Sequence, residues 1–349
     1  MKKLFYLFIF YVIAVSCTKT SNNPTETFLT GNGVFILNEG NFTWGNGSLS
    51  FYSYDSSKIY NNLFMNINER PLGDVPNSMN IKDDRAYIVV NNSGKIEVIN
   101  KNTLESVATI NGLTSPRNIA FTNNNTAYVT SMYSDTVKII SLIDNTISGY
   151  IDLKRYSESI VISGSKAFIS NMLGPQYVSG NEILVVNTEN NEVVDYITVG
   201  FEPESMVIDK NKMLWVLCNG GLARDNFARM VAINTLTNSI EKNIEFPTIT
   251  TSPSCLRIDG KGETLYYLEN GVHSMNIGDT QLPTTPLIPE STHYFYKLGI
   301  NPENSDIFIT DAVDYQQKGY LLYYQMDGTF VSEQNANIIP GFMNFKVEP

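Results

Sequence analysis

The sequence predicts an all-β protein, a seven-bladed β-propeller with four antiparallel strands in each blade. Two strand-like runs recur as a matched pair seven times, a run that begins with proline precedes several of these pairs, and the last residues supply a strand that the first pair lacks. No stretch keeps apolar residues at helical spacing for more than about two turns. A unit of four short antiparallel strands that repeats radially is the architecture of a propeller.

The residues before the repeats are expected to be an export signal. Lys2 and Lys3 supply a positive end, and residues 4–15 form an apolar run. That run is too short to cross a bilayer core of roughly 30 Å. It ends in Ala-Val-Ser-Cys, which resembles a lipobox, so we expect cleavage before Cys17 and acylation of that cysteine. The alternative is an ordinary signal peptide in which the cysteine is coincidental.

The domain boundaries follow from this expectation. Residues 1–17 form the lipoprotein signal peptide, and residues 18–30 are polar and contain proline, as flexible tethers do. Residues 31–349 form the propeller. A segment of about 320 residues is long for one ordinary core but normal for a closed all-β ring.

The first member of each repeated pair is a short run rich in aromatic and β-branched residues, the composition of strands. Its seven copies are GVFILNEG (33–40), RAYIVVNN (85–92), TAYVTSMY (126–133), KAFISNML (166–173), MLWVLCNG (213–220), TLYYLENG (264–271) and DIFITDAV (306–313). The second member follows after a loop. Its copies are GSLSFYSY (47–54), GKIEVINK (94–101), DTVKIISL (135–142), NEILVVNT (181–188), ARMVAINT (228–235), GVHSMNIG (271–278) and GYLLYYQM (319–326). We expect each pair to form the second and third strands of one blade.

Two further runs complete the unit. An edge-like run such as SVATI (106–110) or EVVDYITV (192–199) follows the pair, and a Pro-led run then begins the next unit. The Pro-led runs are PNSMNI (76–81), PRNIAF (116–121), PESMVI (203–208) and PSCLRI (253–258). Proline at a strand entrance removes no ladder donor. We therefore expect four strands in about 40 to 50 residues.

The C-terminal residues are expected to close the ring. The first copy has no Pro-led run before it, whereas PGFMNFKV (340–347) aligns with PNSMNI (76–81). This late strand should pair into the first blade, beside residues 33–64. Closure in this way leaves no open sheet edge between the first and last blades.

Charge and composition narrow the partners. The net charge is −11, from 35 acidic and 24 basic residues, so neither nucleic acid nor anionic lipid is expected as the main partner. The 20 Tyr and 18 Phe fit twisted strands. Besides Cys17 the chain has only Cys218 and Cys255, which could form one disulfide or remain as two buried thiols.

Four loops between second and third strands are expected to be long, at 38–47, 171–182, 218–229 and 310–319. Each holds Gly or Pro together with an aromatic residue, and shorter segments on the same face add two tyrosines. The aromatic residues are Phe42, Trp44, Tyr133, Tyr156, Tyr177, Phe227 and Tyr315. Aromatic side chains raised on one face favour a ligand platform. The alternative is that each folds down over its own blade.

Polar residues near the start of the innermost strands are expected at the mouth of the central channel. They are Asn77, Arg117, Glu158, Glu204 and Arg257. These groups could orient the amides or carboxylates of a ligand, or could pair with one another and with water. His293, in the connection before the last blade, could cap a ligand at the same face.

Catalytic motifs are scarce. The chain has two histidines, His273 and His293, so a three-histidine zinc site is impossible. His273 falls within a strand-like run and is expected to be packed. No nucleophile elbow, Cys-x-x-Cys pair, phosphate-binding loop or EF-hand loop is present in the sequence. We therefore expect a protein that is not an enzyme, without a metal or a catalytic cofactor.

With these features the chain resembles the YncE-like seven-bladed propeller lipoproteins of Bacteroidetes. The resemblance covers residues 31–349 and rests on NEGN (38–41), Gly73-Asp74, YIVVNNSGKIEVIN (87–100) and Ser115-Pro116-Arg117. Within that group it is similar to the BtuG-like surface lipoproteins. That similarity implies capture of cobalamin, as a ligand and not a cofactor, and handover to an outer-membrane TonB-dependent transporter.

The resemblance also implies a location and leaves alternatives. It implies an outer membrane lipoprotein on the cell surface, in contact with the membrane only through its lipid. Residues 18–21 lack the acidic run that often marks surface export, so a periplasm-facing lipoprotein stays open. Two other functions remain: a propeller enzyme of the lactonase or lyase type, and a structural propeller that docks a partner protein or a surface polymer.

Overall fold

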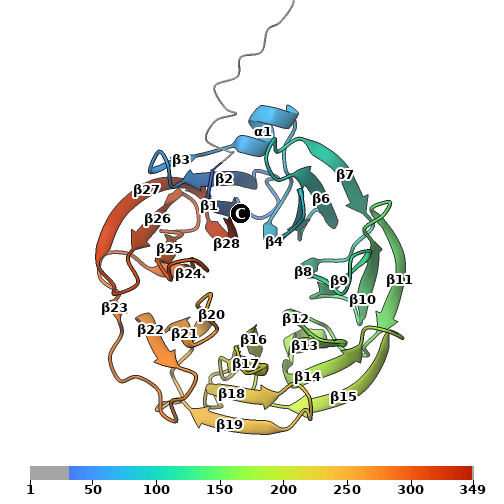
Figure 1. The fold of residues 1–349 in the computed structure, drawn as a ribbon, viewed down its shortest axis with the longest axis vertical. Coiled ribbons are helices and arrows are strands. Elements are labelled where there is room, and N and C mark those ends of the chain that lie inside the picture. The colour runs from blue at the N-terminus through green and yellow to red at the C-terminus, as the bar shows by residue number, and fades with distance from the viewer. Residues whose placement is uncertain (1–30, 348–349) are drawn as a thin grey trace, which may run out of the picture.

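Residues 31–347, the part of the chain that the computed structural model describes, form a closed ring of seven four-stranded antiparallel sheets around a central axis (Figure 1). The predicted seven-bladed propeller is confirmed, and the matched pairs form the second and third strands of the blades. The expected signal peptide, tether and Cys17 lie outside the described residues. Within them, no helix is long and apolar enough to span a membrane.

The innermost strands line the axis. Counted from the first blade, they are β28 (Pro340–Lys346), β4 (Pro76–Lys82), β8 (Pro116–Phe121), β12 (Ile160–Ser163), β16 (Pro203–Ile208), β20 (Ser254–Ile258) and β24 (Phe295–Ile300). Four of them begin with proline, and β20 begins directly after Pro253. The Pro-led runs therefore mark entry into the innermost strand, where the missing N–H breaks no ladder.

The two middle strands of each blade carry most of the core. The second strands are β1 (Gly33–Asn38), β5 (Arg85–Val90), β9 (Thr126–Ser131), β13 (Lys166–Leu173), β17 (Met213–Cys218), β21 (Thr264–Leu268) and β25 (Ile307–Asp311). The third strands are β2 (Ser48–Ser53), β6 (Lys95–Asn100), β10 (Thr136–Ser141), β14 (Ser179–Asn187), β18 (Arg229–Asn234), β22 (Gly271–Asn276) and β26 (Lys318–Tyr324). Second strands are buried on both faces because each blade packs between two neighbours.

The outermost strands are more exposed and vary in length. They are β3 (Lys58–Tyr60), β7 (Ser106–Asn111), β11 (Thr146–Asp152), β15 (Glu192–Thr198), β19 (Ile240–Glu245), β23 (Ile288–Pro289) and β27 (Phe330–Ile338). Exposed and half-buried residues alternate along β15 and β19, the period-2 pattern of a strand with one wet face. The outer strand of the sixth blade, β23, has only two residues.

The ring closes as predicted. The C-terminal strand β28 pairs antiparallel with β1, from Gly33 opposite Lys346 to Asn38 opposite Pro340. The first blade is therefore built from both ends of the propeller (Figure 1). The two ends of the ring are held by the same ladder that holds every other blade together.

The core consists of seven apolar clusters, and each fills the gap between two neighbouring blades. Between the first and second blades, for example, Phe35 and Phe51 pack with ring centroids 4.8 Å apart, against Met79 and Ile88. Burial of each such side chain stabilises the fold by roughly 1.5–3 kcal/mol. The blades are thus held to one another by side chains and internally by backbone ladders.

A short helix is among the elements that the sequence did not predict. A helix of six residues, α1 (Leu63–Asn68), lies in the connection from β3 to β4 and buries Leu63 and Phe64 against the first cluster. Left-handed residues bound it on both sides, at Asn62 and Glu69. Six residues make fewer than two helical turns, which is too short for a helical period to show in the sequence.

Candidate functional site

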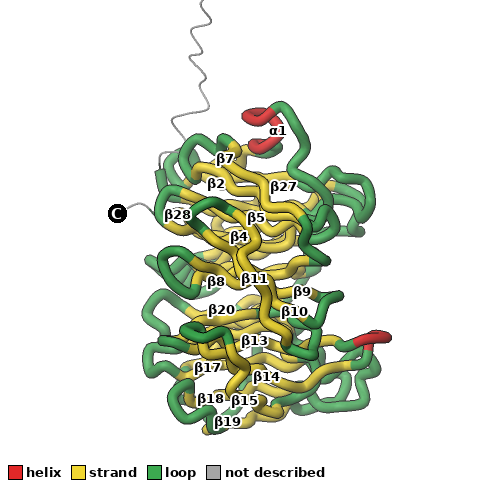
Figure 2. Tube along the Cα trace, turned by 90° about the vertical axis from the view of Figure 1, so that its right-hand side faces the viewer, coloured by secondary structure: helices red, strands yellow, loops and turns green. Residues whose placement is uncertain are grey.

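The innermost strands begin on the same face that carries the loops between second and third strands. Pro76 pairs with Val90, the last residue of β5, and Pro203 pairs with Cys218, the last residue of β17. The start of each inner strand therefore lies where the second strand turns into its loop. We call this side the loop face. Figure 2 shows it on the right, with the short helix η1 (Pro175–Tyr177) projecting from it, the C-terminus opposite and α1 at the top, on the outer rim of the ring.

The four long loops lie where the sequence predicted. They connect second to third strands in the first, fourth, fifth and seventh blades. In the fourth blade, β13 and β14 extend into the predicted loop, so that only residues 174–178 form the tip, including η1. That hairpin therefore rises above its neighbours as an extension of the sheet, which holds Tyr177 away from the core.

A repeated β-bulge places the polar side chains of the channel mouth. The register between the inner and second strands shifts directly after the first inner residue in the second, third, fifth, sixth and seventh blades. Asn77, Arg117, Glu204 and Tyr296 each occupy such an unpaired position. A bulge bends its strand and re-aims the extra side chain, so one backbone device supplies polar groups from four blades.

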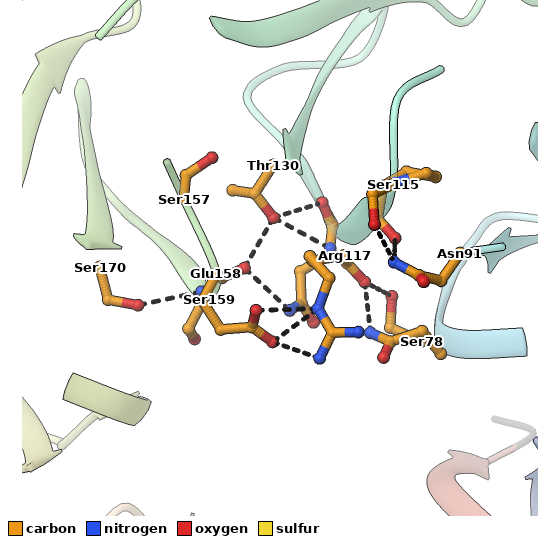
Figure 3. Close-up of polar contacts among 12 residues, drawn as sticks. Ser78, Asn91, Ser115, Arg117, Thr130, Ser157, Glu158, Ser159 and Ser170 are labelled. Atoms are coloured by element: carbon orange, nitrogen blue, oxygen red, sulfur yellow. Dashed lines mark hydrogen bonds and ion pairs between the residues drawn. The ribbon is translucent and has the colours of Figure 1, made fainter. Parts of the chain in front are cut away.

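Arg117 and Glu158 form the main ion pair of the mouth (Figure 3). The Arg117 Nε atom donates to the two Glu158 carboxylate oxygens at 2.9 and 2.8 Å, and an Arg117 terminal nitrogen lies 2.8 Å from the same group. The Glu158 carbonyl accepts hydrogen bonds from Thr130 Oγ1 at 2.6 Å and from the Asn118 side chain at 3.0 Å. These bonds join the third blade to the fourth.

Two of the other three predicted mouth residues also link blades. Asn77 donates to the carbonyl of Arg117 at 2.7 Å, and Glu204 accepts from the backbone N–H of Cys255 at 3.0 Å. Arg257 donates to its neighbouring carbonyl, that of Leu256, at 2.8 Å. The interpretation in which these groups pair with one another therefore holds for much of the set. Their alignment around the axis still leaves a polar, preorganised mouth.

Three mouth residues were not selected from the sequence. Tyr296 donates its hydroxyl to a Glu39 carboxylate oxygen at 2.8 Å, and the Lys297 ammonium lies 4.9 Å from the centre of the Tyr296 ring. Glu39 belongs to the NEGN motif, and the other two residues open β24, whose run lacks a leading proline. The signal for Tyr296 and Lys297 was a strand-like run of six residues at the position of an inner strand, without a leading proline.

The resolved pKa shifts at the mouth move groups away from neutrality. Burial opposes the charge on Arg117, but Glu158 outweighs it and raises the pKa of the guanidinium. Burial likewise opposes the charge on the Lys297 ammonium, yet the nearby Cys255, Tyr296, Glu204 and Glu39 raise the pKa of that group. Burial raises the pKa of Tyr296. None of these three groups acquires a pKa near neutral, which is what a general acid or base would need.

A groove of about 760 Å³ opens on the loop face between the third and fourth blades. Tyr133 and Tyr156 line it, and Tyr177 of η1 packs against Tyr133. The ring of Tyr133 meets each of the other two edge-on, with centroids 6.4 Å apart in both cases. A hydrogen bond to Tyr177 raises the pKa of Tyr133. The structure thus brings together three of the seven predicted aromatic residues.

The polar wall of the groove was also missed by sequence reasoning. Arg155 donates through Nε to Glu182 at 2.8 Å, and Lys154 pairs with Asp152 beside it. Ser134, Ser179 and Asn181 add hydroxyl and amide groups to the lining. Tyr156 also lines a smaller cavity together with Glu158, so this tyrosine borders both the groove and a residue of the channel mouth. The sequence signal for this wall was the pair Lys154 and Arg155, directly before Tyr156.

Phe42 and Trp44 remain exposed at 67% and 76%, at the tip of the loop after β1. Asn46 Oδ1 accepts the Asn41 N–H at 2.8 Å, and the Thr43 N–H donates to Asp74 at 2.9 Å. Gly40 takes a φ of +73°, which suits glycine and lets the loop turn back closely. Asn41 also donates to the Tyr315 carbonyl at 3.0 Å. The loop is therefore held against the seventh blade with its two aromatic rings outward.

The remaining predicted residues are dispersed. Phe227 lies in the loop of the fifth blade, and Tyr315 packs edge-on against Tyr296 with centroids 5.5 Å apart. His293 contacts Asp311 through Nδ1 at 2.7 Å and Glu333 through Nε2 at 3.2 Å. Both of its nitrogens are therefore engaged within the seventh blade. The predicted aromatic residues form a groove at one blade interface and separate exposed groups elsewhere, rather than one continuous platform.

The cysteines and histidines of the described chain show no catalytic arrangement. Cys218 and Cys255 are both free and buried, so the thiol alternative holds. Burial raises the pKa of the Cys218 thiol to about 12. Residues 31–347 contain no group of three His, Cys, Asp or Glu side chains arranged to hold a metal ion. His273 is packed, as expected, and its ring stacks on that of Tyr267 with the two ring centroids 5.2 Å apart.

One family model and several solved structures match this chain. A family model described as "Domain of unknown function (DUF5074)" matches residues 32–340. A quinonprotein alcohol dehydrogenase-like protein of Bacteroides thetaiotaomicron shares 13% identity over 91% of this chain and 78% of its own, with a TM-score of 0.70. A protein named as a candidate 6-phosphogluconolactonase of Bacteroides fragilis shares 11% identity over 91% of this chain and 98% of its own, with a TM-score of 0.66.

A protein of Lactobacillus plantarum shares 11% identity over 90% of this chain and 100% of its own, with a TM-score of 0.68. The comparison with curated proteins found no match. At these identities the solved structures show a shared fold alone. Any statement about ligands must therefore come from the residues of this chain.

Proposed function

The chain belongs to the family described as a domain of unknown function (DUF5074), a description that assigns no activity, and we propose from its own loop face that it captures a small ligand without converting it. The groove between the third and fourth blades is the proposed binding site. Binding without chemistry suits the neighbouring channel mouth, where the pKa values of Arg117, Tyr296 and Lys297 are all raised, away from neutrality.

The observation that carries this proposal is the groove with its three tyrosines. Its volume of about 760 Å³ lies within the range of small-molecule sites. Tyr177 stays 64% exposed at the tip of its hairpin. An amphipathic ring held out of the core loses favourable burial unless a ligand covers it.

Cobalamin is the favoured ligand. Its corrin ring is wide and partly apolar, and amide groups fringe it. Tyrosine rings supply flat contact area, and Ser134, Ser179 and Asn181 supply hydroxyl and amide partners for such a fringe. The NEGN motif and the repeats carry the resemblance to YncE-like propeller lipoproteins, and the choice of cobalamin follows the BtuG-like branch of that group.

The anchor and the partner belong to the same proposal. Acylation of Cys17 would hold the propeller at the outer membrane, and the polar residues after it would let the loop face turn towards a transporter. The cell surface is the proposed side, and handover to a TonB-dependent transporter is the proposed next step. Labelling of intact cells against a lysed control tests the side.

Calorimetric titration tests the ligand. Residues 18–349 contain the whole closed ring, and we expect cobalamin to bind them with measurable heat and a shift in its visible spectrum at micromolar concentration. The double variant Tyr133→Ala and Tyr177→Ala should weaken binding at least tenfold, because each ring buries apolar area against the ligand. Absence of heat and of a spectral shift in the wild-type chain removes cobalamin.

A matched control keeps the test specific. Tyr150 and Tyr196 are also exposed tyrosines, but they lie on the outer strands β11 and β15. The double variant Tyr150→Ala and Tyr196→Ala removes the same groups away from the loop face and should leave affinity within twofold. Equal losses in the two double variants would place the site elsewhere.

A propeller enzyme is the second candidate, favoured by one observation. The Bacteroides fragilis relative is named as a candidate 6-phosphogluconolactonase. Propeller lactonases generally need a divalent ion, so metal analysis of the purified protein discriminates. A stoichiometric divalent ion together with lactone hydrolysis would favour the enzyme, and a metal-free, inactive preparation would favour binding alone.

A further inference from the structure

The sixth blade departs from the other six at its outer edge. Its last strand β23 pairs only with Gly271 and Val272, so the rest of β22 has no outer partner in the described chain. Residues 277–287 cross that edge as an extended connection, visible as the long orange segment between β22 and β23 (Figure 1). Lys242 holds its beginning by donating to the carbonyls of Ile277 and Asp279 at 2.7 and 2.8 Å.

A pocket of about 380 Å³ lies between this connection and the fifth blade. Its apolar wall comes from Phe246, Tyr267, Leu282 and Pro283. The Phe246 and Tyr267 rings meet edge-on with centroids 5.6 Å apart, and His273 stacks on the other side of Tyr267. The pocket is separate from the groove of the third and fourth blades and shares no lining residue with it.

The charged groups in the wall are all acidic. Glu245 and Glu269 line the pocket, and its lining contains no lysine or arginine. Glu245 is paired with Arg229, which reduces its attraction for a second cation. Glu269 accepts a hydrogen bond from the Asn270 side chain at 2.8 Å and forms no ion pair with a described residue. One carboxylate without a counter-charge therefore faces an aromatic pocket.

His273 adds an acceptor to the same wall. Its Nε2 lies 3.0 Å from the Glu269 carbonyl, which can only accept, so Nε2 carries the proton and Nδ1 presents a lone pair. The side chain is only 7% exposed, and no described residue donates to Nδ1. Burial lowers the pKa of the imidazole despite the neighbouring Glu269. The ring is thus neutral, and its acceptor is left without a donor.

We propose that this pocket binds a small organic cation, an ammonium group carried on an apolar or aromatic body. The carboxylate of Glu269 supplies the opposite charge, and the aromatic rings supply apolar contact and cation–π attraction. A neutral ligand would use only the rings. An anion would meet the unpaired Glu269 carboxylate with no lysine or arginine in the pocket lining to offset it.

Three ligands of one shape test the charge preference: benzylamine, benzyl alcohol and benzoate. We expect benzylamine to shift the amide resonances of residues 245–251, 267–273 and 282–284 in the 18–349 chain. Benzyl alcohol should bind at least tenfold more weakly, and benzoate more weakly still. No shift with millimolar benzylamine, or equal binding of amine and alcohol, overturns the proposal.

Two isosteric variants assign the effect. Glu269→Gln keeps the acceptor for Asn270 and should lose about tenfold in benzylamine affinity together with the preference over benzyl alcohol. Glu241→Gln makes the same charge change on the same outer strand as Glu245, near its other end, and should stay within twofold. Unchanged selectivity in Glu269→Gln contradicts the proposal, whatever the outcome with cobalamin. The wild-type resonance map stands even if a variant folds poorly.

Discussion

Polar side chains at the channel mouth mainly connect neighbouring blades, rather than remaining unpaired for a ligand. Arg117, Asn77 and Glu204 sit at bulges and bond to the next inner strand. A mostly buried ion pair is costly to break on one side because the other charge then lacks compensation. The mouth is therefore a place where binding and stability depend on the same residues.

Loss of Glu158 should destabilise the ring. Glu158→Gln removes the charge that faces Arg117, whose side chain is largely buried. We expect a fall of about 2 kcal/mol in the free energy of unfolding, measured by urea titration. Glu263→Gln is the control, because its pair with Lys210 is exposed and should change stability by less than about 0.5 kcal/mol. Equal effects in the two variants would mean that burial of the pair is unimportant.

His273 should make stability depend on pH in a defined direction. Its pKa in the folded protein lies below the ordinary value of 6.5, so below that pH the unfolded chain binds more protons than the folded one. Stability should therefore fall as the pH drops through 6.5 towards the folded pKa, by at most about 1.4 kcal/mol per pH unit. His273→Gln should flatten this part of the curve. A variant that keeps the full slope assigns it to other groups.

Residues of the site were partly predictable. Arg117 and Glu204 follow a strand-entrance proline, and the sequence shows that signal directly. Tyr296 and Lys297 occupy the equivalent place in a strand without the proline, and a bulge has no signature in a single sequence. The convergence of Tyr133, Tyr156 and Tyr177 also depends on how high β13 and β14 rise, which side-chain packing decides.

At the scale of elements, the closing strand and the raised hairpin have separate functions. β28 completes the first blade, and the extension of β13 and β14 builds one wall of the groove. Seven blades and ring closure were predictable because the period of the repeat and the spare C-terminal strand are both in the sequence. The helix α1 and the two-residue β23 were not, since each departs from the repeat locally.

Removal of β28 should open the ring. A chain that ends at Ile339 leaves the inner edge of β1 unpaired, with β2 still on its other edge, and exposes the cluster to which Val34, Ile36 and Met343 belong. We expect loss of cooperative thermal unfolding and association through the free edge. A chain that ends at Lys346 keeps the strand and should melt like the full propeller. Cooperative melting of the shorter chain would show that closure is dispensable.

Shortening the raised hairpin should remove binding and keep the fold. Replacing residues 172–181 with Asn-Gly joins Asn171 to Glu182, which already face each other in the ladder, through a two-residue turn. The circular dichroism spectrum should stay that of a β protein, while ligand affinity falls at least tenfold. Replacing residues 219–228 of the fifth blade in the same way is the matched control, because Cys218 and Arg229 also face each other. Its ligand affinity should stay within twofold.

At the scale of the whole molecule, the ring separates stability from recognition. Apolar clusters between the blades hold the fold, while one face gathers the loops and the mouth. This arrangement lets the loop lengths vary without loss of the core. The central claim is that ligand recognition occurs in the groove between the third and fourth blades.

Hydrogen exchange with and without saturating cobalamin tests that claim most directly. The account predicts slower exchange at residues 132–135, 154–156 and 171–182, which form the groove, and no change at residues 143–145 and 236–238 on the opposite face. Bound ligand that leaves the groove segments unprotected, or protects the opposite face instead, would contradict it.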